Sequence, residues 1–331
     1  IFTFQTSNRL HQIIAYFRFL LRSTNQHGVH SPFVYNLLTK CLYKKESKPA
    51  FKIIENFRKE LLNDHREINV TDFGAGSRVF KSNKRKVSDI AKNAGISKKR
   101  AILLNKLTSY FEIESALELG TSVGISSAAI AAGNNVTLTT REGCPETAAV
   151  AGEYFRLFKL DSINLEVGSF DVILKFQIPN SKFQAPKKNL QHTTYNLQPT
   201  TDNRQLTTDK KSQNPNPKSQ KPNPEQQTNN LQLTIDNRQL STDNRQPSTD
   251  LVYFDGNHQK DATLKYFNML LPLAQNDSVF IFDDIHWSKG MEEAWEEIKG
   301  HPRVRVTIDS FFWGIVFFRA EQEKEHFTIR L

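Results

Sequence analysis

Three acidic side chains come directly after apolar segments that are typical of buried strands. Asp255 ends the segment that starts at Leu251, and the pair Asp283 and Asp284 ends the segment that starts at Ser278. Ligands collect beyond the carboxyl ends of strands in open α/β sheets, so neighbouring strands would bring the three carboxylates together. Carboxylates that close repel one another unless a cation holds them, and oxygen-only ligation suits Mg²⁺ or a similar divalent ion. Helix capping by Asp284 and hydrogen bonding of a substrate by Asp255 stay open as alternatives.

His258 follows Asp255 by three residues and is therefore expected at the same edge of the sheet. The ordinary pKa of histidine lies near neutrality, which lets the ring take a proton from a substrate hydroxyl. We therefore predict His258 as a catalytic base. The alternative is a histidine that faces water at the start of a helix.

The segment Ala116–Gly124 predicts a buried strand followed by a tight turn, and Ile125–Ala132 predicts the helix that comes next. Backbone N–H groups at such a helix start can receive a polar ligand. The loop from Gly120 to Gly124 lacks the G-x-G-x-x-G pattern that receives a pyrophosphate and the G-K-[ST] of a P-loop. A cofactor without a phosphate fits this loop better.

A second strand-like run, Val136–Thr140, is followed at once by Glu142. An acid just past the second parallel strand is well placed to accept hydrogen bonds from both hydroxyls of a ribose. The loop and Glu142 together therefore predict a cofactor that contains adenosine.

Glu118–Gly124 followed by Glu142 resembles the first two motifs of the class I S-adenosylmethionine-dependent methyltransferases. The resemblance implies that Glu118 and Gly120 lie along the methionine part of the cofactor and that Glu142 holds its ribose. The full set of expected cofactor-binding residues is Glu118, Gly120, Thr121, Ser122, Gly124, Glu142 and Asp255.

Two later segments, Asp255–His258 and Phe282–Gly290, resemble the catechol O-methyltransferase-like branch of these enzymes. That branch holds its metal with an Asp after strand four and an Asp-Asn pair after strand five. The resemblance implies that Asp255, Asp283 and Asp284 are metal ligands. Asp284 departs from the usual Asn, and His258 stands where the branch often carries a catalytic lysine.

The order of the expected elements predicts an α/β fold. It is a doubly wound, seven-stranded, mostly parallel sheet, the Rossmann-like methyltransferase fold, with a helical N-terminal cap over residues 1–110. The catalytic domain is expected over residues 111–331. Two closing strands, Val304–Ile308 and Gly314–Arg319, have little chain between them, so we expect a hairpin that makes one strand antiparallel.

A low-complexity segment at about residues 179–250 interrupts the catalytic domain. It is rich in Gln, Asn, Thr, Pro and Lys and carries the heptapeptide Asp236–Thr242 repeated at once as Asp243–Thr249. Such a composition buries too little apolar surface to offset the entropy of ordering, so we predict a disordered insertion between two strands of one sheet.

The composition constrains the partners and the compartment. The net charge is +9, but its densest clusters, Lys81–Lys86 and Lys98–Arg100, are predicted to be solvated helix faces, with a phosphate-binding patch as the alternative. Cys41 and Cys144 lie far apart, which favours a reducing compartment, and we expect the cytoplasm. The apolar run Ile13–Leu21 is interrupted by Arg18 and too short to span a bilayer, so no membrane partner is expected.

The residues and the resemblance together predict an S-adenosylmethionine-dependent methyltransferase. We expect transfer to a hydroxyl of a small molecule, assisted by a divalent cation, with His258 removing the proton. Two alternatives remain. The basic charge would suit a nucleic-acid methyltransferase, although no base-clamping Asn/Asp-Pro-Pro-Tyr/Phe motif occurs, and the repeat segment would suit a non-catalytic cofactor-binding or interaction protein.

Overall fold

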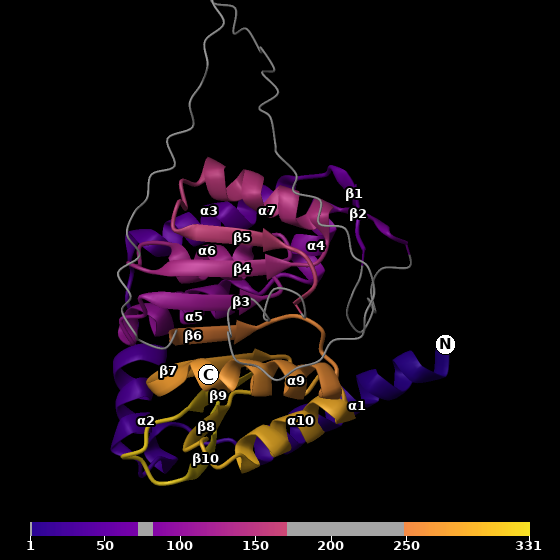
Figure 1. Ribbon diagram of the computed structural model, residues 1–331. Helices are drawn as coiled ribbons and strands as arrows, with labels where there is room; N and C mark the ends of the chain where they lie inside the picture. Colours follow the sequence, from indigo (N-terminus) through magenta and orange to yellow (C-terminus); the bar gives the residue numbers. More distant parts are fainter. Residues whose placement is uncertain (1, 72–81, 171–247) are drawn as a thin grey trace, which may run out of the picture. The chain divides into compact units, whose positions relative to one another are not determined.

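The centre of the molecule is an eight-stranded sheet. The computed structural model describes residues 2–71, 82–170 and 248–331. The strands lie in the order β10-β8-β9-β7-β6-β3-β4-β5 (Figure 1). Their bounds are β3 Ser115–Leu119, β4 Thr137–Glu142, β5 Ile163–Val167, β6 Thr249–Phe254, β7 Ala274–Asp283, β8 Val306–Asp309, β9 Trp313–Phe317 and β10 Glu325–Thr328.

The directions of the strands confirm a mostly parallel sheet. The neighbouring strands β7, β6, β3, β4 and β5 pair in parallel, and β9 runs antiparallel to both β7 and β8. The predicted closing hairpin is therefore present. The predicted number of strands, seven, is one too few, because β10 adds a parallel strand beside β8. Its sequence, Glu-His-Phe-Thr, is polar and half exposed, so it gives no hydrophobic signal of a strand.

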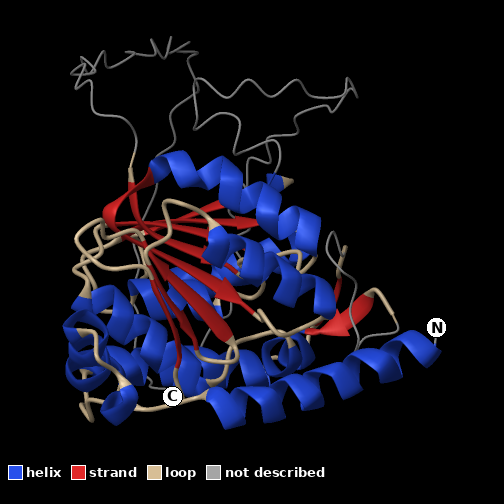
Figure 2. Cartoon of the chain, turned by 90° about the horizontal axis from the view of Figure 1, so that it is seen from below, coloured by secondary structure: helices blue, strands red, loops and turns tan. Residues whose placement is uncertain are grey.

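Helices cover both faces of the sheet (Figure 2). Successive side chains of a strand point to opposite faces, so Ala116 of β3 belongs to one hydrophobic core and its neighbour Leu117 to the other. The first core contains side chains of the helices from α2 to α7, and the second those of α9 and α10. The bounds of these helices are α2 Pro32–Leu37, α3 Pro49–Asn63, α4 Val87–Asn93, α5 Lys98–Tyr110, α6 Ile125–Ala131, α7 Pro145–Leu157, α9 Lys260–Leu270 and α10 Lys289–Gly300.

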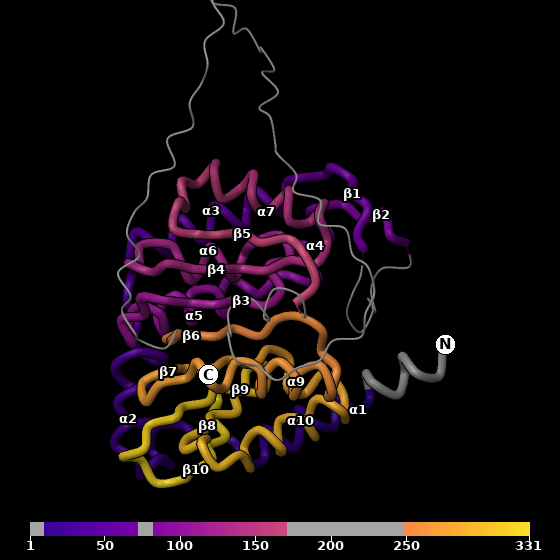
Figure 3. The backbone as a smooth tube through the Cα atoms, in the orientation of Figure 1, coloured from indigo at the N-terminus to yellow at the C-terminus, as the bar shows by residue number. Residues whose placement is uncertain are grey.

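The chain begins with a long helix, α1 (Phe2–Arg22), that runs alongside α10 (Figure 3). An ion pair between His11 and Glu292 joins the two helices, with 3.5 Å between its atoms. The C-terminal residues pair with the end of α1, where the Arg330 N–H donates to the Thr24 carbonyl. The helical N-terminal region predicted from the sequence is thus present. The domain boundary at residue 110 remains a prediction.

Two predictions concern segments that lie mostly or partly outside the described residues. The low-complexity insertion falls there except for residues 248–250, the last two of which begin β6. Its flanking strands β5 and β6 belong to the same sheet, as expected. The second segment is the basic cluster Lys81–Lys86, which is described from residue 82 onward. Its end, Lys84–Lys86, forms strand β2, paired antiparallel with β1 (Glu67–Asn69), instead of the predicted helix face.

Candidate functional site

A cavity of about 370 Å³ opens at the carboxyl ends of four neighbouring parallel strands. The loops that follow β3, β4, β5 and β6 all contribute to its wall, which is where open α/β sheets bind ligands. The residues around it are Val70, Thr71, Arg85, Ile90, Ala94, Gly120, Ser122, Glu142, Gly143, Thr147, Gly168, Ser169, Phe170, Asp255, Gly256, Asn257 and Tyr266. The predicted residues Gly120, Ser122, Glu142 and Asp255 are thus together in one cavity.

The loop after β3 depends on glycine at two positions. Gly120 has a φ of +105°, and a Cβ there would lie 2.6 Å from the carbonyl oxygen of Asp255. Gly124 has a φ of +87° and caps helix α6, with the ring of Phe155 2.6 Å from its virtual Cβ. Both glycines therefore allow the loop to pack tightly against neighbouring elements, which leaves the backbone of Gly120 and Ser122 at the cavity.

Glu118 and Thr121 hold this loop from inside the core. Glu118 is fully buried and accepts hydrogen bonds from the hydroxyls of Ser127 and Thr140. Burial raises the pKa of Glu118 above its ordinary value. The Thr121 and Thr140 hydroxyls lie 2.6 Å apart. The roles of Glu118, Thr121 and Gly124 toward the cofactor remain predictions, because none of the three residues borders the cavity.

Glu142 borders the cavity directly and is fixed by the backbone. Its Oε2 accepts the Ser122 N–H at 2.8 Å, and its Oε1 accepts the Cys144 N–H at 2.9 Å. Burial raises the pKa of Glu142, and the hydrogen bonds from the backbone act against that rise. Each carboxylate oxygen has a second lone pair, so both can accept a further hydrogen bond from a ligand. This geometry is what the ribose prediction requires.

The three predicted metal ligands lie close together, because strands β6 and β7 are neighbours in register. A cation already occupies the cluster, however. The Arg100 Nη1 lies 3.0 Å and 3.4 Å from the two carboxylate oxygens of Asp283. Burial, together with the charges of Asp283 and Asp284, raises the pKa of Asp255 well above its ordinary range. The hydrogen bond between Asp255 and Asp283 raises the pKa of Asp255 further.

Arg100 was not predicted for this site. The sequence places it in the basic cluster Lys98–Arg100, where Lys98 and Lys99 are exposed, as predicted. Only 22 % of the Arg100 side chain is exposed, and its guanidinium reaches Asp283. Within residues 2–71, 82–170 and 248–331, no group of three or more His, Cys, Asp or Glu side chains is arranged to hold a metal ion.

His258 lies beside the cluster, as its position after Asp255 predicts. Its Nε2 is 3.8 Å from Oδ1 of Asp255, and 22 % of the side chain is exposed. The ring of Trp287 lies 6.3 Å away between centroids. His258 is thus close to the cavity-lining Asp255 and partly exposed, although it does not itself border the cavity. Its catalytic role remains a prediction.

The sequence did not reveal two aromatic residues of the cavity wall, Phe170 and Tyr266. Their rings meet edge to face with centroids 5.6 Å apart. Tyr266 lies in helix α9, where an aromatic at helical spacing is indistinguishable in the sequence from an ordinary core residue. Phe170 comes just before the part of the chain that is not described, and its nearness to Gly256 is the feature that places it.

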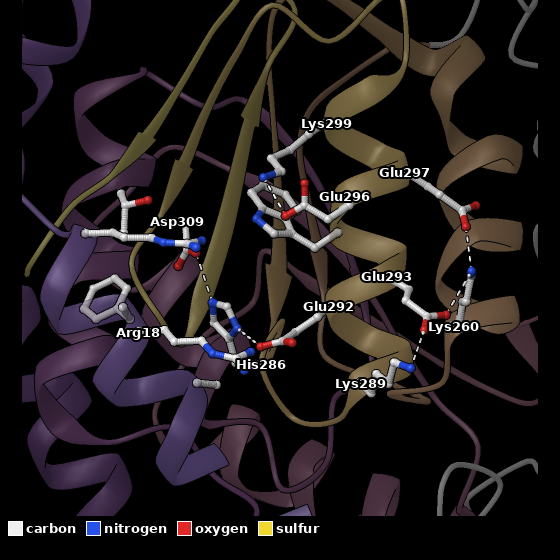
Figure 4. Close-up of a pocket in the computed structure, with 15 residues that line it drawn as sticks. Arg18, Lys260, His286, Lys289, Glu292, Glu293, Glu296, Glu297, Lys299 and Asp309 are labelled. Atoms are coloured by element: carbon white, nitrogen blue, oxygen red, sulfur yellow. Dashed lines mark hydrogen bonds and ion pairs between the residues drawn. The ribbon is translucent and has the colours of Figure 1, made fainter. Parts of the chain in front are cut away.

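A second, larger cavity of about 590 Å³ lies between α1 and α10, and it contains none of the predicted site residues (Figure 4). His286 is held there between two carboxylates. Its Nδ1 is 2.8 Å from Glu292 and its Nε2 2.9 Å from Asp309. Burial alone would lower the pKa of His286, but the hydrogen bonds with Asp309 and Glu292 outweigh burial and raise the pKa to about 9. This charged cluster ties the hairpin to α10.

No helix in the described part of the chain combines the length and apolar character needed to cross a membrane. A search of curated proteins found no match. The O-methyltransferase of Bacillus cereus in complex with SAH is similar in structure, with 14% identity over 82% of this chain and 92% of that chain and a TM-score of 0.43. The methyltransferase PaMTH1 of Podospora anserina, bound to SAH, has 11% identity over 88% of this chain and 97% of that chain, with a TM-score of 0.47.

The O-methyltransferase TomG of Streptomyces achromogenes, involved in tomaymycin synthesis and bound to SAM, is also similar. It has 13% identity over 86% of this chain and 94% of that chain, with a TM-score of 0.45. A family model described as a methyltransferase domain matches residues 117–285, just over half of the chain. The matched part runs from β3 to the residues after β7 and so contains the glycine loop, Glu142 and the carboxylate cluster. With this match and the sheet order described above, the chain belongs to the methyltransferase domain family and is an enzyme of the class I S-adenosylmethionine-dependent type.

Proposed function

We propose that this enzyme transfers the methyl group of S-adenosylmethionine to a hydroxyl oxygen of a small molecule. One observation carries the proposal. Gly120, Ser122, Glu142 and Asp255 border a single cavity at the ends of the parallel strands, and the ring of His258 lies 3.8 Å from Asp255. The wall thus offers backbone groups and carboxyl oxygens to a cofactor, with a proton acceptor beside it.

In this proposal the cofactor lies across the loops after β3 and β4. Glu142, held by the N–H groups of Ser122 and Cys144, accepts the ribose hydroxyls. The ring of Tyr266 and the side chain of Phe170 give the cavity an apolar wall. Fixed donors and acceptors of this kind bring the methyl group and the acceptor oxygen into line, which supplies much of the rate increase in such transfers.

The chemical step follows from these positions. The hydroxyl oxygen attacks the methyl carbon, an O–C bond forms as the S–C bond breaks, and the sulfonium becomes the neutral thioether of S-adenosylhomocysteine. His258 takes the proton of the hydroxyl as the new bond forms. The total charge is unchanged, because the positive charge of the sulfonium is lost and one appears on the imidazolium of His258.

The residues present do not fit the divalent cation that the resemblance implies. Asp283 is paired with Arg100, and Asp255 hydrogen-bonds Asp283 and has a pKa well above its ordinary range, mainly because it is buried. A hard cation needs ionised carboxylate oxygens at about 2.0–2.6 Å with no competing positive group beside them. We therefore assign no step of the transfer to a metal.

Isothermal titration calorimetry with S-adenosylmethionine and S-adenosylhomocysteine tests the cofactor part of the proposal. Transfer of a labelled methyl group to small hydroxyl compounds and, separately, to DNA and RNA tests the acceptor part. We expect saturable binding of both cofactor forms and label in the small molecules. Failure to bind either form refutes the proposal, and label that appears only in nucleic acid replaces the acceptor by the alternative class.

A further inference from the structure

Arg100 enters the carboxylate cluster from the first turn of helix α5, whose N-cap is Ser97. Its partner Asp283 is the last residue of β7, so the pair joins positions 183 residues apart in the sequence. The exposed fraction is 5 % for the side chain of Asp283 and 22 % for that of Arg100. The pair is thus buried on the aspartate side and partly exposed on the arginine side.

The contact is made to both oxygens of Asp283 by a single nitrogen. The distances from Nη1 are 3.0 Å to Oδ1 and 3.4 Å to Oδ2. A divalent cation ligated by Asp283 would have to lie within about 2.6 Å of one of these oxygens, which would put it beside the guanidinium. Two positive groups that close repel each other strongly in a partly buried site. Arg100 and a metal therefore compete for the same carboxylate.

The guanidinium is also held from its other side. The Arg100 Cζ lies 4.9 Å from the centroid of the Phe312 ring, which stacks on it. A guanidinium carries five N–H donors. In the part of the chain that the structure describes, the hydrogen bonds to Asp283 use Nη1 alone, which leaves Nε and Nη2 as donors for a ligand.

We propose that Arg100 takes the place of the divalent cation in this site, so that the working enzyme is metal-free and the guanidinium binds the acceptor oxygen. Binding of the acceptor rests on the proposed function, whereas exclusion of the metal does not. Arginine suits this task because it stays charged under all ordinary conditions and its planar donors fix the direction of an oxygen. Asp283 then acts as a positioning residue that orients Arg100.

Titration with Mn²⁺, followed by electron paramagnetic resonance, tests the exclusion directly. The titration compares the wild-type enzyme with Arg100→Ala and with Arg100→Gln, which keeps most of the side-chain length without the charge. A fourth protein carries Asp283→Asn alone, and a fifth combines it with Arg100→Ala. The matched control is Lys98→Ala, which removes a cation from the same helical turn whose ion-pair partner is Glu55 instead of Asp283. Thermal unfolding confirms that each variant is folded.

We expect no Mn²⁺ site that depends on Asp283 in the wild-type enzyme or in Lys98→Ala. Removing the charge of Arg100 should tighten Mn²⁺ binding by on the order of tenfold or more, because the repulsion disappears, and Asp283→Asn should abolish the gain. A wild-type Mn²⁺ site that Asp283→Asn removes overturns the proposal, even if no Arg100 variant folds. A folded Arg100→Ala protein without a new site overturns it as well.

Calorimetry with S-adenosylhomocysteine separates this inference from the proposed function. If the wild-type enzyme does not bind S-adenosylhomocysteine, the proposed function is refuted and the Mn²⁺ result is unaffected. Once an acceptor is found, wild-type turnover should survive excess EDTA, while Arg100→Lys should raise KM for the acceptor more than for the cofactor. Turnover that EDTA removes and Mg²⁺ restores overturns the inference with the proposed function intact.

Discussion

Substitution of Glu142 by Gln probes the cofactor site most directly. The carboxylate accepts the Ser122 N–H on one oxygen and the Cys144 N–H on the other, and it borders the cavity. The amide of Gln keeps one acceptor, but its NH₂ group must face either a backbone N–H or a ribose hydroxyl. At least one buried hydrogen bond is therefore lost in the complex.

The structure sets the size of the effect. An unsatisfied buried polar partner costs about 1–3 kcal/mol, which corresponds to an increase in Kd of about 5- to 140-fold. Calorimetry with S-adenosylhomocysteine measures this change, and thermal unfolding reports the separate cost to the loop. The matched control is Glu153→Gln on α7, whose partner is Arg66 and whose side chain is 52 % exposed.

The control should leave Kd unchanged, because an exposed ion pair contributes little. If folded Glu142→Gln binds S-adenosylhomocysteine as tightly as the wild-type enzyme does, the ribose does not lie on Glu142 and the orientation of the cofactor is wrong.

Three further predictions concern catalysis, the loop and pH. His258→Ala should lower kcat by about 10²- to 10⁴-fold with a modest change in KM, and a near-normal kcat would show that the ring is not the base. Gly120→Ala should lower the midpoint of thermal unfolding and weaken cofactor binding, because its Cβ meets the Asp255 carbonyl at 2.6 Å; a midpoint equal to wild type would contradict this close packing. The pKa of His286 is about 9 in the folded protein and 6.5 in the free side chain. The protonated ring therefore adds up to about 3 kcal/mol to the free energy of unfolding below pH 6.5, and this stabilisation is lost as the pH rises through 9. Urea unfolding from pH 6 to 10 measures this loss, which His286→Gln should abolish and which persists if other groups cause it.

The fold was predictable where the signal is local. The strand predicted from Ala116 onward is β3, and the loop from Gly120 to Gly124 precedes the helix that it was expected to begin. Runs of buried apolar residues followed by glycine or an acid carry this information within ten residues. Strand β10 lacks such a run, because Glu325 and His326 are exposed and its stability comes from pairing with β8.

The candidate site was predictable in its parts and not in its connections. That Asp255 and Asp283 meet follows from two local signals and the rule that ligands collect at strand ends. That Glu118 faces the core and Glu142 the cavity does not follow from their sequences, since both come at the ends of strands. Which acid is buried depends on the hydroxyls of Ser127 and Thr140, which only the packed helix and strand bring to Glu118.

Arg100 shows why the charge of the site was the hardest property to predict. In the sequence it is the third of three successive basic residues, and nothing local separates it from Lys98 and Lys99. The helix separates them, because each residue turns by about 100° and only one of the three faces the end of β7. A cluster of acids read from the sequence alone calls for a cation. The fold provides one from helix α5, which is distant in the sequence. Because Arg100 itself is this cation, the carboxylates that predict a metal do not need one.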